Sequence, residues 1–260
     1  MTLLFSLAGA LILLFVVLPL AATVVGAGPK AMLDALTQPD MLRSFLLTFA
    51  SALVATAIAV LCGLPLAYLL ARHEFPGKGL VEGIIDIPII VPHTAAGIAL
   101  LMVFGRSGIV GRPLAELSVY FTDDMAGIVI AMLFVSLPLF VDSAREAIAA
   151  VDPRFEGVAR TLGASSWRAV GRVTLPLAWR GILAGGILMW ARGISEFGAV
   201  VILAYNPKVI SVLTYERFSG FGLAEALPVT ALLVVVALLV LVVLRGLLAR
   251  RRPNRDRRTR

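Results

Sequence analysis

The chain has 260 residues, of which 60% are hydrophobic, and it carries a formal net charge of +7. A hydrophobic share so far above the roughly 45–50% of soluble domains, with a mean hydropathy of +0.97, excludes an ordinary soluble enzyme and indicates a membrane protein. One cysteine, Cys62, and two histidines leave no basis for a disulfide framework or a metal site. The excess of arginine follows the last apolar run, which favours lipid contact and topology over nucleic-acid binding.

Six apolar runs are each long enough to cross a bilayer, so the sequence predicts an all-α membrane protein with about six transmembrane helices. The first run lacks a basic leader and exceeds the usual length of a signal-peptide core, so we expect it to be retained. The domains expected are a first helix with an external loop (1–43), a transmembrane domain (44–248) and a basic cytoplasmic tail (249–260). The expected spans are 3–26, 44–72, 80–104, 126–150, 180–204 and 226–248.

Basic residues set the expected orientation. An even number of spans puts both termini on one side, and placing the termini inside gives the cytoplasm about 16 of the 23 lysines and arginines. The positive-inside rule therefore predicts a multi-pass membrane protein with cytoplasmic termini.

Prolines interrupt the predicted third span. Pro88 and Pro92 are expected to kink or break it, and a broken helix frees backbone groups that can face a substrate path. Pro92, His93 and Thr94 are therefore predicted to form a constriction, with a satisfied core histidine as the alternative for His93. Earlier in this span, Glu82 and Asp86 form an acidic i,i+4 pair, either solvated at the interface or in contact with arginines of the 152–176 segment.

A polar, arginine-bearing segment, 152–176, separates the fourth and fifth spans. Asp152 and Pro153 suit a helix start, and Gly163 suits its end. A second short helix is expected from Ser165 to Val173, terminated or bent by Pro176. On the cytoplasmic side these helices would offer a docking surface; the alternative is an amphipathic loop against lipid headgroups.

Two charged residues fall inside the predicted fifth span. Arg192 and Glu196 are spaced i,i+4, which would place them on one face of a continuous helix with Ser195 nearby. Charges within a membrane are costly, so they are candidates for function. The pair is predicted to line or gate a passage through the membrane; the alternative is a structural ion pair involving Asp142 or Glu146.

Polar, glycine-bearing connections follow the third and fifth spans, at about 105–125 and 204–226. The expected orientation places them outside, where they suit contact with a binding protein or serve as simple connectors.

The 152–176 segment resembles the coupling loop of ABC-transporter permeases, whose pattern reads E-A-A, three residues, G, nine residues, I-x-L-P. Here Gly157 occupies the glutamate position, Glu156 stands one residue earlier, and Gly163 and Leu175-Pro176 match the anchors. This resemblance implies that two cytoplasmic ATPase subunits, which bind ATP and Mg²⁺, dock on the segment. The implied coupling residues are Glu156, Gly157, Ala159, Arg160, Gly163, Leu175 and Pro176.

The stretch from Ala191 to Ala199 is similar to the A-R-x-x-x-E-F-G-A stretch of oxyanion importers, and PIIVPHTAAGIALL and YERF are similar to molybdate/tungstate permeases. The resemblance implies a homodimeric, non-catalytic type I importer permease served by an extracytoplasmic molybdate/tungstate-binding protein. It also implies that the membrane is the prokaryotic cell (inner) membrane. The chain has no phosphate-binding loop and no cofactor of its own is expected. The implied pathway residues are Arg192, Ser195, Glu196, Pro92, His93 and Thr94.

Several alternatives remain within and beyond this class. Permeases for sulfate, thiosulfate, ferric ion or polyamine share the architecture, although a polyamine path would favour carboxylates over a central arginine. A membrane-embedded enzyme would need clustered catalytic residues, and an ion-coupled secondary transporter would be expected to show internal repeats; neither feature is visible.

Overall fold

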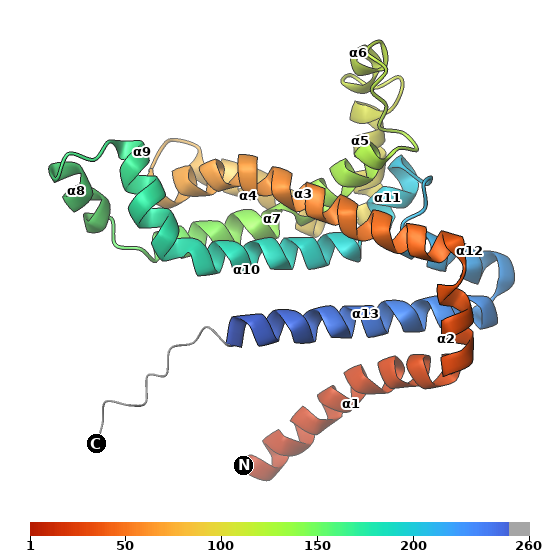
Figure 1. The fold of residues 1–260 in the computed structure, drawn as a ribbon. Helices are drawn as coiled ribbons and strands as arrows, with labels where there is room; N and C mark the ends of the chain where they lie inside the picture. The colour runs from red at the N-terminus through yellow and green to blue at the C-terminus, as the bar shows by residue number, and fades with distance from the viewer. Residues whose placement is uncertain (250–260) are drawn as a thin grey trace. The chain divides into compact units, whose positions relative to one another are not determined.

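The computed structural model describes residues 1–249, with side chains through Val242, and forms two compact units. Unit 1 comprises Met1–Arg43 and the chain from Leu213 on, and unit 2 comprises Ser44–Val212. Within the described residues all regular structure is helical (Figure 1). The elements are α1 Thr2–Ala27, α2 Pro29–Leu36, α3 Pro39–Arg72, α4 Lys78–Ile90, α5 His93–Phe104, α6 Gly111–Ala115, α7 Met125–Ala149, α8 Arg154–Thr161, α9 Ser166–Ala169, π-helix η1 Val170–Thr174, α10 Leu175–Ile194, α11 Gly198–Leu203, α12 Ile210–Phe221 and α13 Leu223–Ala249.

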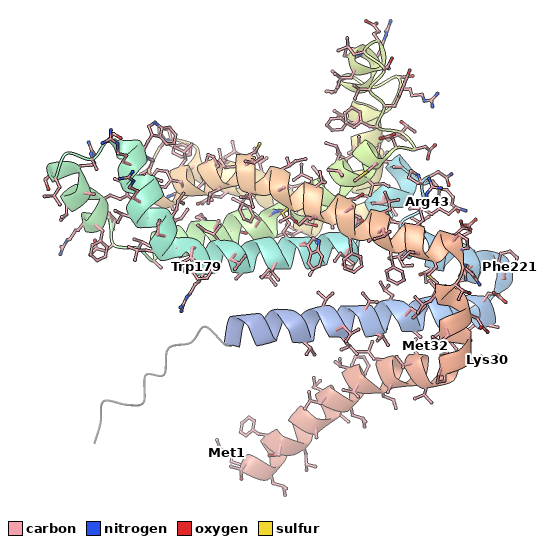
Figure 2. All side chains as sticks on the ribbon, viewed as in Figure 1. Met1, Lys30, Met32, Arg43, Trp179 and Phe221 are labelled. Atoms are coloured by element: carbon pink, nitrogen blue, oxygen red, sulfur yellow. The ribbon has the colours of Figure 1, made fainter. Side chains whose placement is uncertain are left out.

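Unit 1 contains two of the membrane-crossing helices, α1 and α13, which pack on each other. A Cβ on Gly26 would lie 3.4 Å from Leu227, so the helices are close where α1 ends. Apolar side chains stand on all sides of α1, and none of its residues is buried in the unit, as expected of a helix whose solvent is lipid (Figure 2). The predicted basic tail lies outside the described residues except for Ala249.

Unit 2 is built around α7, which packs against α4, α10 and α11. Its buried face includes Ile128, Met132 and Phe140. Glycines on α10 let the two backbones approach, because a Cβ on Gly185 would lie only 2.7 Å from the Cβ of Ser143. Small residues at such crossings are typical of membrane helices.

The six predicted spans are found, but two of them are broken. Five helices are long and apolar enough to cross a membrane, and α4 with α5 makes a sixth only as a pair bent by 115°. The bend follows from Val91-Pro92: the residue before a proline prefers extended backbone, and Val91 has φ −70° and ψ 131°.

The predicted continuous helix over 180–204 is wrong. Helix α10 ends at Ile194, three residues without helical structure follow, and α11 begins at Gly198. Arg192 therefore lies in the last turn of a helix, and Glu196 lies in the break. Ser195 explains part of the interruption, because its hydroxyl donates to the Arg192 carbonyl at 2.9 Å and so competes with the helical pattern.

The 152–176 segment forms the first predicted short helix, α8, whereas the predicted second short helix is the start of a longer one. The Asp152 carboxylate accepts from the Arg154 amide at 2.9 Å, and Gly163, with φ +90°, follows the end of α8 in a conformation that suits glycine. Pro176 does not terminate the second helix. Residues Ser166–Ile194 run on as one helix, in which the π-helical turn η1 immediately precedes Leu175-Pro176. Within unit 2, α8 and α9 lie at one end, and α6 and α11 lie at the other (Figure 1).

Candidate functional site

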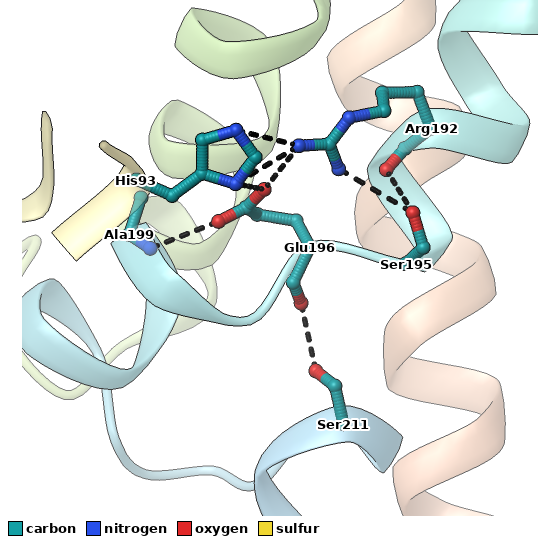
Figure 3. A network of polar contacts seen from close by, with 6 residues as sticks. All are labelled: His93, Arg192, Ser195, Glu196, Ala199 and Ser211. Carbon is teal, nitrogen blue, oxygen red and sulfur yellow. Dashed lines mark hydrogen bonds and ion pairs between the residues drawn. The ribbon is translucent and has the colours of Figure 1, made fainter. Parts of the chain in front are cut away.

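The two helix breaks of unit 2 meet and bring the predicted pathway residues together (Figure 3). His93, the first residue of α5, faces Arg192 at the end of α10 and Glu196 in the break. Close packing of α5 on α11 fixes this meeting. A Cβ on Gly198 would lie 2.7 Å from the Cβ of His93, and one on Gly97 would lie 2.8 Å from the Cβ of Ile202. Neither glycine leaves room for a larger residue.

The Arg192 guanidinium is the centre of this polar cluster. Its Nη2 lies 3.1 Å from Glu196 Oε2 and within 3.0 Å of both ring nitrogens of His93, and its Nη1 donates to Ser195 Oγ at 3.3 Å. A guanidinium can only donate, so a His93 nitrogen must accept. His93 Nδ1 also lies 3.1 Å from Glu196 Oε2.

Glu196 is the buried member of the cluster, with no exposed surface. Its Oε1 accepts from the Ala199 amide at 2.9 Å and so caps the start of α11. Its own carbonyl accepts from Ser211 of α12 at 2.7 Å. Arg192 and Glu196 therefore form an ion pair across a helix break and do not share a continuous helix face.

A cavity of about 540 Å³ adjoins the cluster. Five of the six predicted pathway residues line it, and a quarter of the Arg192 side chain is exposed. Glu196 lies beneath this surface and not on it. The arrangement presents the partly exposed Arg192 guanidinium to the cavity, with His93 and Ser195 beside it and the counter-charge of Glu196 behind it. The lining residues from the prediction are Pro92, His93, Thr94, Arg192 and Ser195.

A second, partly buried glutamate, Glu156, lies in the 152–176 segment, at the other end of unit 2. Tyr68 Oη donates to its Oε2 at 2.9 Å, while Arg72 Nε at 3.0 Å and Thr174 Oγ1 at 2.6 Å donate to its Oε1. Thr174 is fully buried and the Arg72 side chain is 7% exposed. Nη2 of Arg72 is buried as well and has no hydrogen-bond partner among the described residues.

These contacts shift the titration of Glu156. Burial opposes its ionisation, but the hydrogen bonds from Thr174 and Tyr68 and the charge of Arg72 outweigh burial and hold the pKa below the usual value for a glutamate. The carboxylate is therefore ionised at neutral pH.

Sequence reasoning named Glu156 but missed its three partners. Tyr68 and Arg72 are spaced i,i+4 at the end of the second span, and Thr174 occupies the variable position of the family pattern, so none stood out.

The remaining coupling residues are mostly on the surface. A Cβ on Gly157 would meet nothing within 4 Å, and Arg160 and Gly163 are exposed. Large apolar side chains share this surface, which is unusual outside a binding face. The exposed members are Phe155, Val158, Leu162 and Trp167.

The acidic pair of the third span does not meet arginines of the coupling segment. Glu82 instead accepts from Arg145 of α7 at 2.6 Å, and Arg145 also pairs with Asp142 at 3.3 Å. These side chains are about one-third exposed, in accord with an interfacial location. Among the described residues, no group of three histidine, cysteine or acidic side chains could hold a metal ion.

Comparison with known proteins places these features in a wider group. Residues 63–252 match the model of the family described as "Binding-protein-dependent transport system inner membrane component". The chain is 38% identical to the molybdate/tungstate transport system permease protein WtpB of Thermococcus kodakarensis, over 95% of this chain and 96% of that protein. It is 30% identical to the sulfate transport system permease protein CysT of Escherichia coli, over 85% and 82% of the respective lengths.

A solved structure shares the fold. A subunit of a bacterial ABC transporter involved in the import of the acidic polysaccharide alginate superimposes with a TM-score of 0.72, at 17% identity and 96% coverage of both chains.

Proposed function

Because the chain belongs to the family of binding-protein-dependent transport system inner membrane components, we propose that it is the membrane-spanning permease of an ATP-driven importer of molybdate and tungstate. The observation that carries the substrate class is the partly exposed guanidinium of Arg192 in the cavity at the two helix breaks. An arginine fork matches the paired oxygens of a tetrahedral oxyanion. The higher identity to the molybdate/tungstate permease favours those ions over sulfate.

The rest of the machinery follows from this assignment. The permease acts as a homodimer with two cytoplasmic ATPase subunits and an extracytoplasmic binding protein, and both of its termini are cytoplasmic. It binds neither ATP nor a cofactor. The coupling segment, with its exposed Phe155, Val158, Arg160 and Trp167, receives the ATPases at one end of unit 2.

The pathway cluster supplies charge without trapping the anion. When no oxyanion is present, Glu196 neutralises Arg192 at 3.1 Å. An arriving dianion contacts the same guanidinium, and His93 and Ser195 line the cavity beside it. Because Glu196 is fixed by the Ala199 amide, it stays in place and limits the net positive charge, so the anion can leave.

The experiment is ATP hydrolysis by the reconstituted permease–ATPase complex with the binding protein added empty or loaded with molybdate, tungstate or sulfate. We expect stimulation by the molybdate- and tungstate-loaded forms. Stimulation by the sulfate-loaded form alone would change the cargo, and failure of every form would overturn the importer assignment.

The pathway role of Arg192 has its own test in the same complex. Arg192→Gln should reduce uptake of radiolabelled tungstate at least about tenfold, because a neutral amide loses the charge-assisted bonds to the anion. Arg43→Gln, at an exposed position outside both clusters, is the control. Equal uptake by both variants at equal expression would remove Arg192 from the pathway.

A further inference from the structure

The coupling segment, residues 152–176, departs from its family pattern at one position, and this departure changes the direction in which the carboxylate points. Glycine stands at the family's glutamate position, 157, and the carboxylate stands at 156. One residue turns a side chain by about 100° around a helix. The carboxylate of Glu156 consequently points inward, to Tyr68, Arg72 and Thr174, while position 157 faces open space.

We propose that Glu156 is a positioning residue that fastens the coupling helix α8 to α3 and to η1, so that a displacement of α8 by the ATPase moves both membrane helices together. This inference rests on the proposed function, because it assumes that an ATPase pushes on α8. It assigns Glu156 a role inside the permease rather than on the docking surface.

The contacts of Glu156 join three segments that are far apart in the sequence. Its partners lie 88, 84 and 18 residues away. Helix α8 packs on η1 and α9, whereas each hydrogen bond and ion pair found between α8 and α3 in the described part of the chain ends on Glu156. Removing this one carboxylate would leave α8 without a polar tie to α3.

Both elements that Glu156 holds lead to the pathway cluster. The π-helix η1 continues directly into α10, whose last turn carries Arg192. Helix α3 carries both Arg72, at its end, and Ala52, about five and a half turns earlier along the same helix. Ala52 lies beside α10, because a Cβ on Gly193 would be 3.3 Å from the Cβ of Ala52. The Trp190 indole also donates to the Phe49 carbonyl at 3.4 Å. Two continuous helical segments therefore lead from the partners of Glu156 to the neighbourhood of Arg192.

The hydrogen bonds that Glu156 accepts are expected to be strong. Ionised Glu156 accepts three hydrogen bonds, one from a guanidinium, and its side chain is only 16% exposed. Charge-assisted bonds shielded from water are stronger than exposed ones.

The test uses the whole complex and measures stimulation of ATP hydrolysis by the molybdate-loaded binding protein, with co-purification of the ATPase as a second readout. Glu156→Gln should still co-purify the ATPase, because the exposed residues of the segment are unchanged, but its stimulation should fall about tenfold. Glu74→Gln is the matched control: Glu74 also lies beside the end of α3, but 88% of its side chain is exposed and it pairs with Lys78 at 2.6 Å. It should behave as the wild type.

Variants of the partners separate fastening from docking. Tyr68→Phe and Thr174→Val each remove one bond to Glu156 without touching the exposed surface, and each should lower stimulation about threefold. Arg72→Gln should lower it further, and combining it with Glu156→Gln should cost less than the two single losses together, because no buried charge is then left unpaired.

Each outcome decides a different claim. A wild-type complex that no loaded binding protein stimulates would overturn the proposed function itself. If the wild type is stimulated and Tyr68→Phe, Thr174→Val and Arg72→Gln all match it, the fastening role is overturned. Loss of ATPase co-purification in Glu156→Gln, with those three variants unaffected, would assign Glu156 to the docking surface instead.

Discussion

Two glutamates, one fully and one partly buried, pair with arginines at opposite ends of unit 2, and their contacts differ in range. Glu156 meets Arg72 from 84 residues away and joins α8, α3 and η1. Glu196 meets Arg192 from four residues away and stabilises the shape of a helix break. A long-range ion pair ties separate elements to one another, whereas a local pair fixes the conformation of its own segment. A glutamate–arginine pair therefore connects separate helices at one end of unit 2 and fixes the backbone of a helix break at the other.

The largest effect is expected from removing the local carboxylate. Glu196→Ala leaves the partly exposed Arg192 without its counter-ion and the Ala199 amide without its acceptor. Because Glu196 itself has no exposure to solvent, the change should destabilise the protein by about 3–5 kcal/mol. Glu196→Gln keeps an acceptor for Ala199 and should cost less. Thermal unfolding of the purified protein in detergent measures both. Equal loss in the two variants would show that charge matters and the cap does not.

A smaller effect should follow from pushing the two breaks apart. Gly198→Ala would place a Cβ 2.7 Å from the Cβ of His93 and 3.1 Å from the Thr94 nitrogen, so α5 and α11 must separate, at a cost of about 1–3 kcal/mol. Gly186→Ala is the control, because its Cβ would meet Thr56 at an ordinary 3.8 Å and alanine favours a helix. Unfolding midpoints of the two variants should move in opposite directions.

The contribution of the Glu156–Arg72 pair to the stability of the fold should depend on pH. Because the folded-state pKa of Glu156 lies below the ordinary value of 4.5, its ionisation stabilises the fold at pH above that value, and this contribution is lost as the pH falls through the folded pKa. The difference in unfolding midpoint between wild type and Glu156→Gln should be constant from pH 6 to 8 and should shrink below about pH 4.5. A difference that grows with acidity would contradict the lowered pKa.

The smallest effect should come from the Glu82–Arg145 pair, the third glutamate–arginine contact of unit 2. Both side chains are about 30% exposed, so solvent screens their attraction, and Arg145→Gln should cost about 1 kcal/mol or less. Unfolding in detergent at low and high salt measures it. A loss as large as that of Glu196→Ala would mean that exposure is a poor guide to the value of these pairs.

Apolar length alone predicted the number and approximate limits of the spans, since a bilayer demands about 20 apolar residues from each. The break at Pro92 could also be predicted from the sequence, because a proline disfavours helical backbone at the residue before it. The break at 195–197 was not: no proline marks it, and Ser195 and Glu196 interrupt α10 only through contacts with Arg192, Ala199 and Ser211.

The candidate sites show the same division. Arg192 and His93 could be named because charge and polarity are conspicuous in apolar runs, and the structure brings them together. Tyr68 and Thr174 could not be named, since their importance depends on a tertiary contact with Glu156. The inward direction of Glu156 itself needed the position of α3.

The exposed Trp167 gives the coupling segment a built-in optical probe. The chain has three tryptophans, and Trp179 and Trp190 both lie on α10 within the membrane-crossing helix, so replacing them with phenylalanine would leave one fluorophore on α9. Because this chain leaves 86% of the Trp167 surface exposed, its emission should shift to the blue when an apolar partner surface covers it. Arrival of the ATPase could then be timed in stopped-flow without attaching any dye.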